Sequence, residues 1–178
     1  LLMAWARVDP VTRAAHPLVV QCHMDPTTRG AWELRRKELG LDDTVEFTGQ
    51  VTDEELVELM QTASLVVFPS LYEGLGLPVL EALHSGAAVV CGDNSSLREL
   101  VTDPDARFDA TDVDAIAATL TRYLTDGAAL AALAATPVDE RYTWRSVAAH
   151  VVRVYRELLD APARVEVRSR PRLAIASP

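Results

Sequence analysis

The stretch FPSLYEGLGLPVLEAL, residues 68–83, decides the fold of this 178-residue chain. It continues the apolar run LVVF at residues 65–68, which indicates a buried strand, and two glycines then lead to a helix expected to end near Ser85. Pro78 suits the first turn of that helix, because the N–H that proline lacks would have no partner there. A strand, a turn-rich loop and a helix are therefore expected in direct succession.

The same alternation of apolar runs and helical segments extends to both sides of this stretch. Strands are expected at residues 18–22, 45–48, 65–68 and 87–91, with a short one at 107–108. Helices are expected at 27–39, 52–61, 112–126, 128–135 and 143–160, with a short one capped by Ser95 or Ser96. Strands that are apolar on both faces and separated by helices indicate an α/β fold, a Rossmann-like doubly wound parallel sheet.

The composition is typical of a globular protein, since 49% of the residues are hydrophobic, and the formal net charge is -9. An acidic chain repels phosphate backbones, so nucleic acid is disfavoured as a partner. Cys22 and Cys91 make no disulfide framework and are expected to be buried and reduced, in a cytoplasmic protein. Histidine and cysteine lack metal-ligand spacing, so no metal site is predicted. One domain is predicted at residues 1–160 and a disordered tail at 161–178.

The loop within the opening stretch carries groups suited to a phosphorylated ligand. Glycines let the backbone approach a ligand closely, and a helix start offers unpaired N–H groups that suit a diphosphate. Glu73 and Glu81 could accept hydrogen bonds from hydroxyl groups at two ends of one ligand, as carboxylates do for a ribose in nucleotide-binding α/β folds. An isolated glutamate at a helix start can also serve only to match the helix dipole, and that alternative stays open for each of them alone.

Taken together, the strand, the Pro-Ser turn, the two glycines and the glutamates resemble the E-x(7)-E motif of a known family. This family is the retaining GT-B glycosyltransferases called glycosyl transferases group 1, or family 4-like. Residues 45–51, 64–68, 86–99, 112–133 and 143–158 are similar to its further strands and helices. The resemblance covers most of the chain, up to about Asp160, and the central motif is its most specific part.

The resemblance implies a role for each matching residue. Glu73 would be the catalytic residue, because it would bind hydroxyls of the donor sugar and help place the anomeric carbon. Backbone N–H groups of the loop would hold the sugar and the diphosphate, Glu81 would take the ribose hydroxyls, and the turn after the second strand would frame the base. The implied donor-binding residues are Gly74, Leu75, Gly76, Leu77, Glu81, Gln50 and Val51. The donor would be a UDP-, GDP- or ADP-linked sugar, with neither metal nor cofactor.

The chain also departs from the family pattern. Leu75 stands where phenylalanine is frequent, and the family's amino-terminal domain and the first strand of this half have no counterpart. We therefore expect the carboxy-terminal, donor-binding half of a hexosyltransferase, lacking the central strand of its sheet and inactive alone. Its partner would be the missing domain and its acceptor a glycan, a lipid or a small molecule. A membrane-peripheral position of the full-length enzyme stays open.

Other functions remain as alternatives. The chain could be a non-catalytic module that binds a nucleotide sugar or only a partner, and the absent strand favours this if the chain is natural. A nucleotide-sugar epimerase or hydrolase of the same architecture is disfavoured by the glutamate spacing. A dinucleotide oxidoreductase is weaker still, because no Gly-x-Gly-x-x-Gly follows the first strand.

Overall fold

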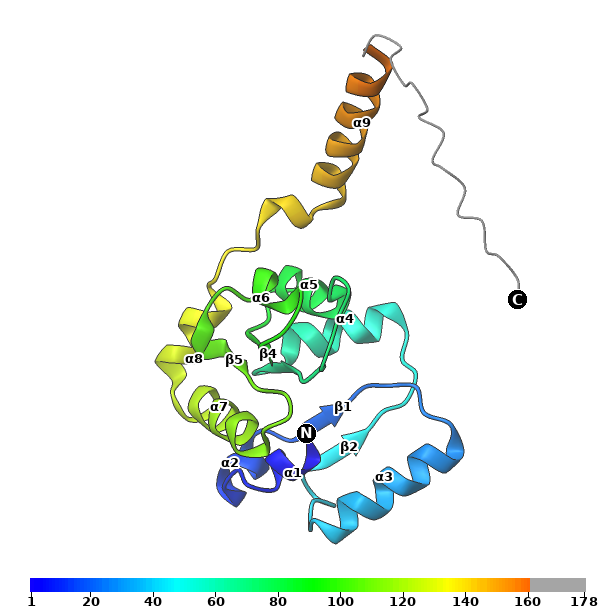
Figure 1. The fold of residues 1–178 in the computed structure, drawn as a ribbon. Helices are drawn as coiled ribbons and strands as arrows, with labels where there is room; N and C mark the ends of the chain where they lie inside the picture. Colours follow the sequence, from blue (N-terminus) through cyan, green and yellow to red (C-terminus); the bar gives the residue numbers. More distant parts are fainter. Residues whose placement is uncertain (161–178) are drawn as a thin grey trace, which may run out of the picture. The chain divides into compact units, whose positions relative to one another are not determined.

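The structure is a computed structural model that describes residues 1–160, so the tail predicted at 161–178 lies outside the described residues. The chain divides into two units, residues 1–139 and residues 140–178. Strands and helices alternate through the first unit (Figure 1). Its strands are β1 (Leu18–Val20), β2 (Val45–Phe47), β3 (Val66–Phe68), β4 (Val89–Gly92) and β5 (Arg107–Phe108). Its helices are α1 (Leu2–Trp5), α2 (Pro10–Ala15), α3 (Pro26–Glu38), α4 (Asp53–Thr62), α5 (Leu77–His84), α6 (Leu97–Leu100), α7 (Val113–Thr125) and α8 (Gly127–Ala134), with a 3-10 turn η1 (Pro104–Ala106).

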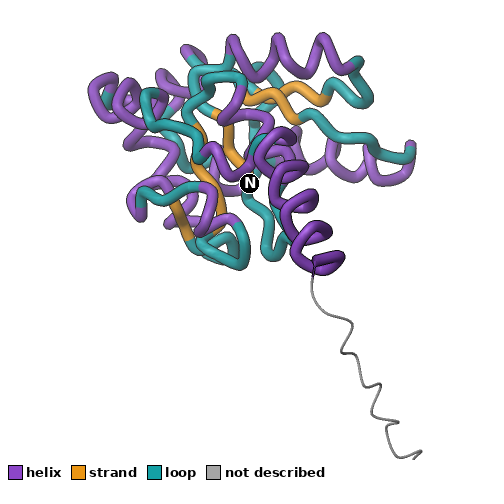
Figure 2. Tube along the Cα trace, turned by 90° about the horizontal axis from the view of Figure 1, so that it is seen from above, coloured by secondary structure: helices purple, strands orange, loops and turns teal. Residues whose placement is uncertain are grey.

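All strand pairs are parallel, which confirms the predicted α/β class. The strands form two sheets instead of one: β1 pairs with β2, and β4 lies between β3 and β5. The tube view draws the strands in orange among the helices and loops (Figure 2). Among residues 1–160 no strand joins β1 to β3. This gap falls where the absent central strand was predicted.

The core of the first unit is centred on β4. Val89, Val90 and Cys91 are completely buried, and each faces a partner in β3 or β5 through the parallel register. Val79 of α5 and Leu97 of α6 are also fully buried in the same core cluster. A strand that is buried on both faces is typical of the inner position of a parallel sheet. The loops that leave β3 and β4 therefore start from a rigid base.

Strand ends differ from the predicted ones by one or two residues. β1 ends at Val20, so Cys22 lies past the strand and is only half-buried, against the expectation that both cysteines are buried. The run at residues 87–91 begins its pairing at Val89, and Ala87 and Ala88 are buried before it. Pairing with a neighbour sets these bounds, because the β1–β2 ladder has only three residue pairs.

Helix starts in the first unit use side-chain caps. Asp9, Asp25, Asp112 and Asp126 each accept hydrogen bonds from backbone N–H groups of the helix that follows. Thr52 and Glu55 form a capping box at the start of α4, the helix predicted at 52–61. Hydrogen bonds from the hydroxyls of Thr12 and Thr28, and then from backbone N–H groups, lower the pKa of the Asp9 and Asp25 carboxyl groups, respectively. Each cap fixes the direction in which its helix leaves the preceding segment.

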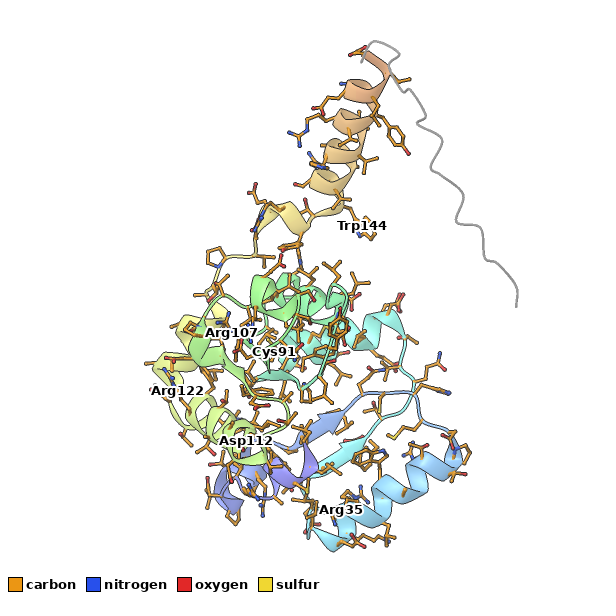
Figure 3. The ribbon with its side chains drawn as sticks, in the orientation of Figure 1. Arg35, Cys91, Arg107, Asp112, Arg122 and Trp144 are labelled. Carbon is orange, nitrogen blue, oxygen red and sulfur yellow. The ribbon has the colours of Figure 1, made fainter. Side chains whose placement is uncertain are left out.

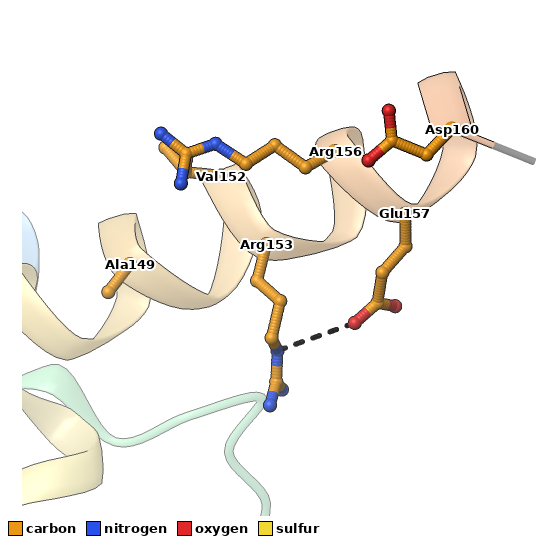
Figure 4. A pocket seen from close by; sticks show the side chains of 6 residues that line it. All are labelled: Ala149, Val152, Arg153, Arg156, Glu157 and Asp160. Atoms are coloured by element: carbon orange, nitrogen blue, oxygen red, sulfur yellow. Dashed lines mark ion pairs between the residues drawn. The ribbon is translucent and has the colours of Figure 1, made fainter.

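The described part of the second unit contains a 3-10 turn η2 (Glu140–Tyr142) and helix α9 (Trp144–Asp160). Thr143 caps α9, the helix predicted at 143–160, because its hydroxyl accepts the N–H of Ser146 at 3.2 Å. Trp144, labelled in Figure 3, is 86% exposed. Along the polar side of α9 lies a hollow of about 550 Å³, where Arg153 pairs with Glu157 (Figure 4). No described helix is long and apolar enough to cross a membrane.

Candidate functional site

The predicted site residues lie in two segments that follow parallel strands. The loop of residues 69–76 leaves the carboxyl end of β3 and enters α5. A second, shorter turn leaves β2 at Thr48 and reaches the cap of α4 at Thr52. Both segments therefore start at the strand end where α/β sheets bind ligands.

Glu73 is held on its side chain and on both sides of its backbone. The hydroxyl of Ser70 donates to the Glu73 carboxylate at 2.8 Å. The N–H of Glu73 donates to the Ser95 hydroxyl at 3.0 Å, and the Ser96 hydroxyl donates to the Glu73 carbonyl at 3.2 Å. One carboxylate oxygen remains outside this network, so Glu73 can still accept a hydrogen bond from a ligand hydroxyl.

Four consecutive backbone N–H groups follow Glu73 without an acceptor in residues 1–160. They belong to Gly74, Leu75, Gly76 and Leu77, the last of which is the first residue of α5. The next N–H groups along the chain, those of Val79 and Leu80, already donate to the carbonyl of Gly76. Unpaired N–H groups at a helix start, next to the positive end of the helix dipole, favour a phosphate or another anion.

The two glycines of the loop have different surroundings. Gly76 has φ +85°, and a Cβ atom on it would lie 2.7 Å from Cδ2 of Leu97 in α6. A Cβ atom on Gly74 would meet nothing within 4 Å. Gly76 is therefore required by the left-handed backbone and by close packing on α6. The open space is at Gly74, beside Glu73, where a ligand could approach the backbone.

Glu81 lies exposed in the second turn of α5, and its carboxylate has no hydrogen bond or ion pair to any described residue. Gln50 is exposed and Val51 half-buried, in the turn before α4. No hydrogen bond within the described chain links Gln50 or Val51 to the loop after β3. The structure thus gathers Glu73 and the four N–H groups, whereas the roles of Glu81, Gln50 and Val51 stay predictions.

Charged side chains near the carboxyl end of β4 pair with one another. Arg98 and Arg107 both contact one carboxylate oxygen of Asp93, at 2.9 and 3.0 Å. Arg107 also faces Cys91 across the β4–β5 ladder, and both are labelled in Figure 3. Arg98 therefore forms an internal ion pair. A hollow of about 300 Å³ lies beside this cluster and is lined by Leu71, Asp93, Asn94, Arg98, Asp109, Ala110 and Thr111.

Sequence reasoning missed the polar residues that surround Glu73. Ser95 and Ser96 were predicted as alternative caps for α6, but Ser96 at the cap position makes no side-chain bond to the helix and binds Glu73 instead. Ser70 was noted only as part of the Pro-Ser turn and Asn94 was not singled out, yet the Asn94 amide donates to the Ser70 carbonyl at 2.7 Å. The available signal was the polar run of residues 93–96 directly after a buried strand. Residues 1–160 hold no cluster of three potential metal ligands.

Residues 28–136 match the family described as Glycosyl transferases group 1. The O-antigen chain mannosyltransferase B of Escherichia coli is 31% identical over 160 residues, which are 89% of this chain and 42% of that protein. The match to the family takes in β2, β3, β4 and β5 and the whole loop with Glu73.

Solved structures share the fold. Sucrose-phosphate synthase from Thermosynechococcus elongatus aligns with a TM-score of 0.72 at 24% identity, over 90% of this chain and 43% of that one. The C-terminal domain of a glycosyl transferase group 1 protein from Francisella tularensis aligns with a TM-score of 0.64 at 24% identity, over 75% of this chain and 71% of that one.

The chain spans less than half the length of the mannosyltransferase and of the synthase that it matches. The family match covers the parallel strands β2 to β5 and the loop after β3, so the sequence and the structure indicate the same family. The chain belongs to the glycosyl transferases group 1 family, and its α/β fold is that of the carboxy-terminal half of a GT-B glycosyltransferase.

Proposed function

We propose that this chain forms the donor site of a retaining glycosyltransferase, which binds a nucleoside-diphosphate sugar and transfers its hexosyl group. The observation that carries the proposal is the row of four N–H groups without acceptors directly after Glu73. A diphosphate that accepts hydrogen bonds from this row would lie at the start of α5, and the sugar attached to it would reach the Glu73 carboxylate.

In this arrangement each part of the loop acts on a different part of the donor. Glu73 accepts hydrogen bonds from sugar hydroxyls and places the anomeric carbon, while the N–H groups of residues 74–77 bind sugar and diphosphate oxygens. As the glycosidic bond breaks, negative charge grows on the departing diphosphate. Fixed N–H groups and the helix dipole stabilise that charge without a metal ion. Glu81, in the second turn of α5, accepts from the ribose, and Gln50 and Val51 border the base.

The relative's name bears on the sugar. The Escherichia coli protein with 31% identity is called a mannosyltransferase, so mannose is the hexose that we propose first. UDP, GDP and ADP all remain candidates for the nucleotide, because every proposed phosphate contact comes from backbone groups that do not read the base.

We further propose that the acceptor, a glycan, a lipid or a small molecule, is bound by a part of a longer enzyme that this chain does not include. The chain matches only 42% of the length of its mannosyltransferase relative. Isolated, it would bind the donor or its nucleotide without transferring sugar. Transfer from a labelled donor by the chain alone would refute the last point.

Calorimetric titration of the chain with UDP, GDP, ADP and NAD tests the donor site. We expect one nucleoside diphosphate to bind, and Glu81→Ala to weaken it, because the carboxylate that accepts from the ribose is removed. Glu58→Ala, an exposed glutamate on α4, is the matched control. Equal affinity of the wild type and Glu81→Ala would remove Glu81 from the site.

The enzyme's chemistry is tested in the longer gene product. There we expect Glu73→Ala to lower turnover by orders of magnitude while Glu81→Ala mainly raises the donor KM, because of the two carboxylates only that of Glu73 contacts the reacting sugar. NMR of the first product formed would show whether the anomeric configuration is retained. Donor binding with no transfer to any acceptor would instead favour a non-catalytic binding module.

A further inference from the structure

The turn after β4 binds the backbone of Glu73 from both sides. Ser95 and Ser96 are 22 and 23 residues away from Glu73 in sequence, yet their hydroxyls contact its N–H and its carbonyl at 3.0 and 3.2 Å. Consecutive serines therefore fix the orientation of one peptide unit on each side of the Glu73 Cα atom. The two peptide planes set the direction of the Glu73 Cα–Cβ bond, and the hydrogen bond from the Ser70 hydroxyl restrains the carboxylate at the other end of the side chain.

Asn94 closes the arrangement into a ring of hydrogen bonds. Its amide donates to the carbonyl of Ser70 at 2.7 Å, and its side-chain oxygen accepts from the Ser95 hydroxyl at 3.0 Å. The Ser70 hydroxyl in turn donates to the Glu73 carboxylate at 2.8 Å. Ser95 thus accepts from Glu73 and donates to Asn94, so its hydroxyl uses both of its hydrogen-bonding functions. Such a ring holds its members more firmly than isolated bonds do.

The backbone around this turn is strained and tightly packed. Ser95 has φ +38°, and no other residue except glycine has a positive φ in residues 1–160. Gly92, three residues earlier, approaches the loop so closely that a Cβ atom on it would lie 2.5 Å from the carbonyl oxygen of Ser70. A serine is held in the left-handed region only where its surroundings over-determine it, and such residues cluster at functional sites.

We propose that the Asn94–Ser95–Ser96 turn is a positioning device that aims the carboxylate of Glu73 at the donor sugar. The proposal rests on the role of Glu73 in the proposed function. The three residues are positioning residues, because each acts on the ligand only through Glu73 or Ser70. Anchoring the turn on β4 ties the direction of the carboxylate to the most deeply buried strand.

Three variants at Ser95 and Ser96 in the longer enzyme test the proposal. Ser95→Gly removes the hydroxyl and relieves the positive φ, so the fold is kept or stabilised while Glu73 loses its partner. Ser96→Ala removes the bond to the Glu73 carbonyl, and Ser96→Thr restores a hydroxyl. We expect Ser95→Gly and Ser96→Ala each to lower kcat about 10-fold or more with an unchanged melting temperature, since small misplacements of a reacting group cost up to about 100-fold.

Thr125→Ala is the matched control, because it removes a 2.7 Å hydroxyl-to-carbonyl bond of the same kind in α7. It should leave kcat and donor KM unchanged. Ser96→Thr should recover most of the lost turnover. Nucleoside-diphosphate binding should persist in every variant, since the N–H groups of residues 74–77 are untouched.

A double-mutant cycle separates positioning from a general structural role. In a Glu73→Ala background, Ser95→Gly should have no further effect on the residual rate, because the group that Ser95 directs is gone. Equal losses with and without Glu73, or wild-type kcat in both serine variants, would overturn the positioning role and leave the donor site intact. A wild-type enzyme that neither binds a nucleoside diphosphate nor transfers sugar would overturn the proposed function, and this inference with it.

Discussion

At the scale of single residues, the two glycines of the loop after β3 should differ in what a substitution by alanine costs in stability. The φ of +85° at Gly76 and the 2.7 Å approach of Leu97 to a Cβ atom there predict that Gly76→Ala destabilises the chain. The expected loss is about 1–3 kcal/mol, from backbone strain and overpacking. Gly74→Ala, with open space around it, should stay within about 0.5 kcal/mol of the wild type. Urea unfolding measures the free energy of unfolding of both variants. Equal losses of stability in the two would mean that the backbone at residue 76 and α6 move to accommodate the new methyl group.

Cys91 gives a second prediction, on thiol chemistry. Burial raises the pKa of its thiol from 9.0 to about 12. At pH 8 we expect iodoacetamide to modify the half-buried Cys22 in the native chain and Cys91 only in denaturant, as mass spectrometry of the peptides would show. Rapid native labelling of Cys91 would contradict its burial.

The same pKa shift sets the sign of a pH effect. The folded chain disfavours the thiolate, so burial of the neutral thiol stabilises the native state fully below pH 9.0, and this contribution is lost as the pH rises from 9.0 to about 12. Cys91→Ala, which has no thiol to ionise, should show less alkaline destabilisation over that range.

At the same scale, some residues of the site could be predicted from the sequence and others could not. Glu73 and Glu81 could be singled out because their relation to the strand, the glycines and the proline is local in sequence. The contact of Ser95 with Glu73 could not, because it spans 22 residues and depends on how two loops close over the ends of β3 and β4. The strained φ of Ser95 has no sequence signal either, since serine rarely adopts it.

At the scale of elements, the capping box of α4 offers a clean test. Thr52 accepts the N–H of Glu55 at 3.2 Å, and the Glu55 carboxylate accepts the N–H of Thr52 at 2.8 Å. Thr52→Ala leaves the Glu55 N–H without this partner and should cost about 1 kcal/mol in the free energy of unfolding. Thr52→Ser keeps a hydroxyl and should cost much less. If Thr52→Ala unfolds at the wild-type urea concentration, water replaces the cap without loss.

Most elements of the first unit could be predicted because their signals are local. Apolar runs mark the strands, and Thr52 and Asp112 mark helix starts. The helix α2 was missed, although Asp9 as a cap and Pro10 in the first turn are the usual signals for a start. The first strand was predicted two residues too long, because an apolar pattern does not reveal how far its neighbour pairs.

At the scale of the whole first unit, the two sheets predict two levels of local stability. β4 is buried along its whole length, whereas β1 has only three residues, one of them exposed. Amide hydrogen exchange should therefore be slowest in β3 and β4 and faster in β1 and β2, because opening the smaller sheet breaks no strand pair of the larger one. Equal protection across all five strands would show that the helices couple the sheets into one cooperative unit.

The division into two sheets could not be predicted from local patterns. Every strand signal is correct in kind, and the βαβ order alone allows one continuous sheet. A strand between β1 and β3 would join the two sheets into one. The apolar pattern of residues 18–108 does not show that β1 and β3 each lack a pairing partner on one side.

The unpaired edges of β1 and β3 have a consequence for the storage of the purified chain. A strand edge with unpaired N–H and C=O groups can pair with another extended chain. A second copy of this chain offers the same unpaired edges. Concentrated stocks of the chain should therefore form oligomers with added β structure on storage. A short extended peptide that pairs with one of these edges would act as a stabilising additive, in the way that a donated strand completes a pilus subunit.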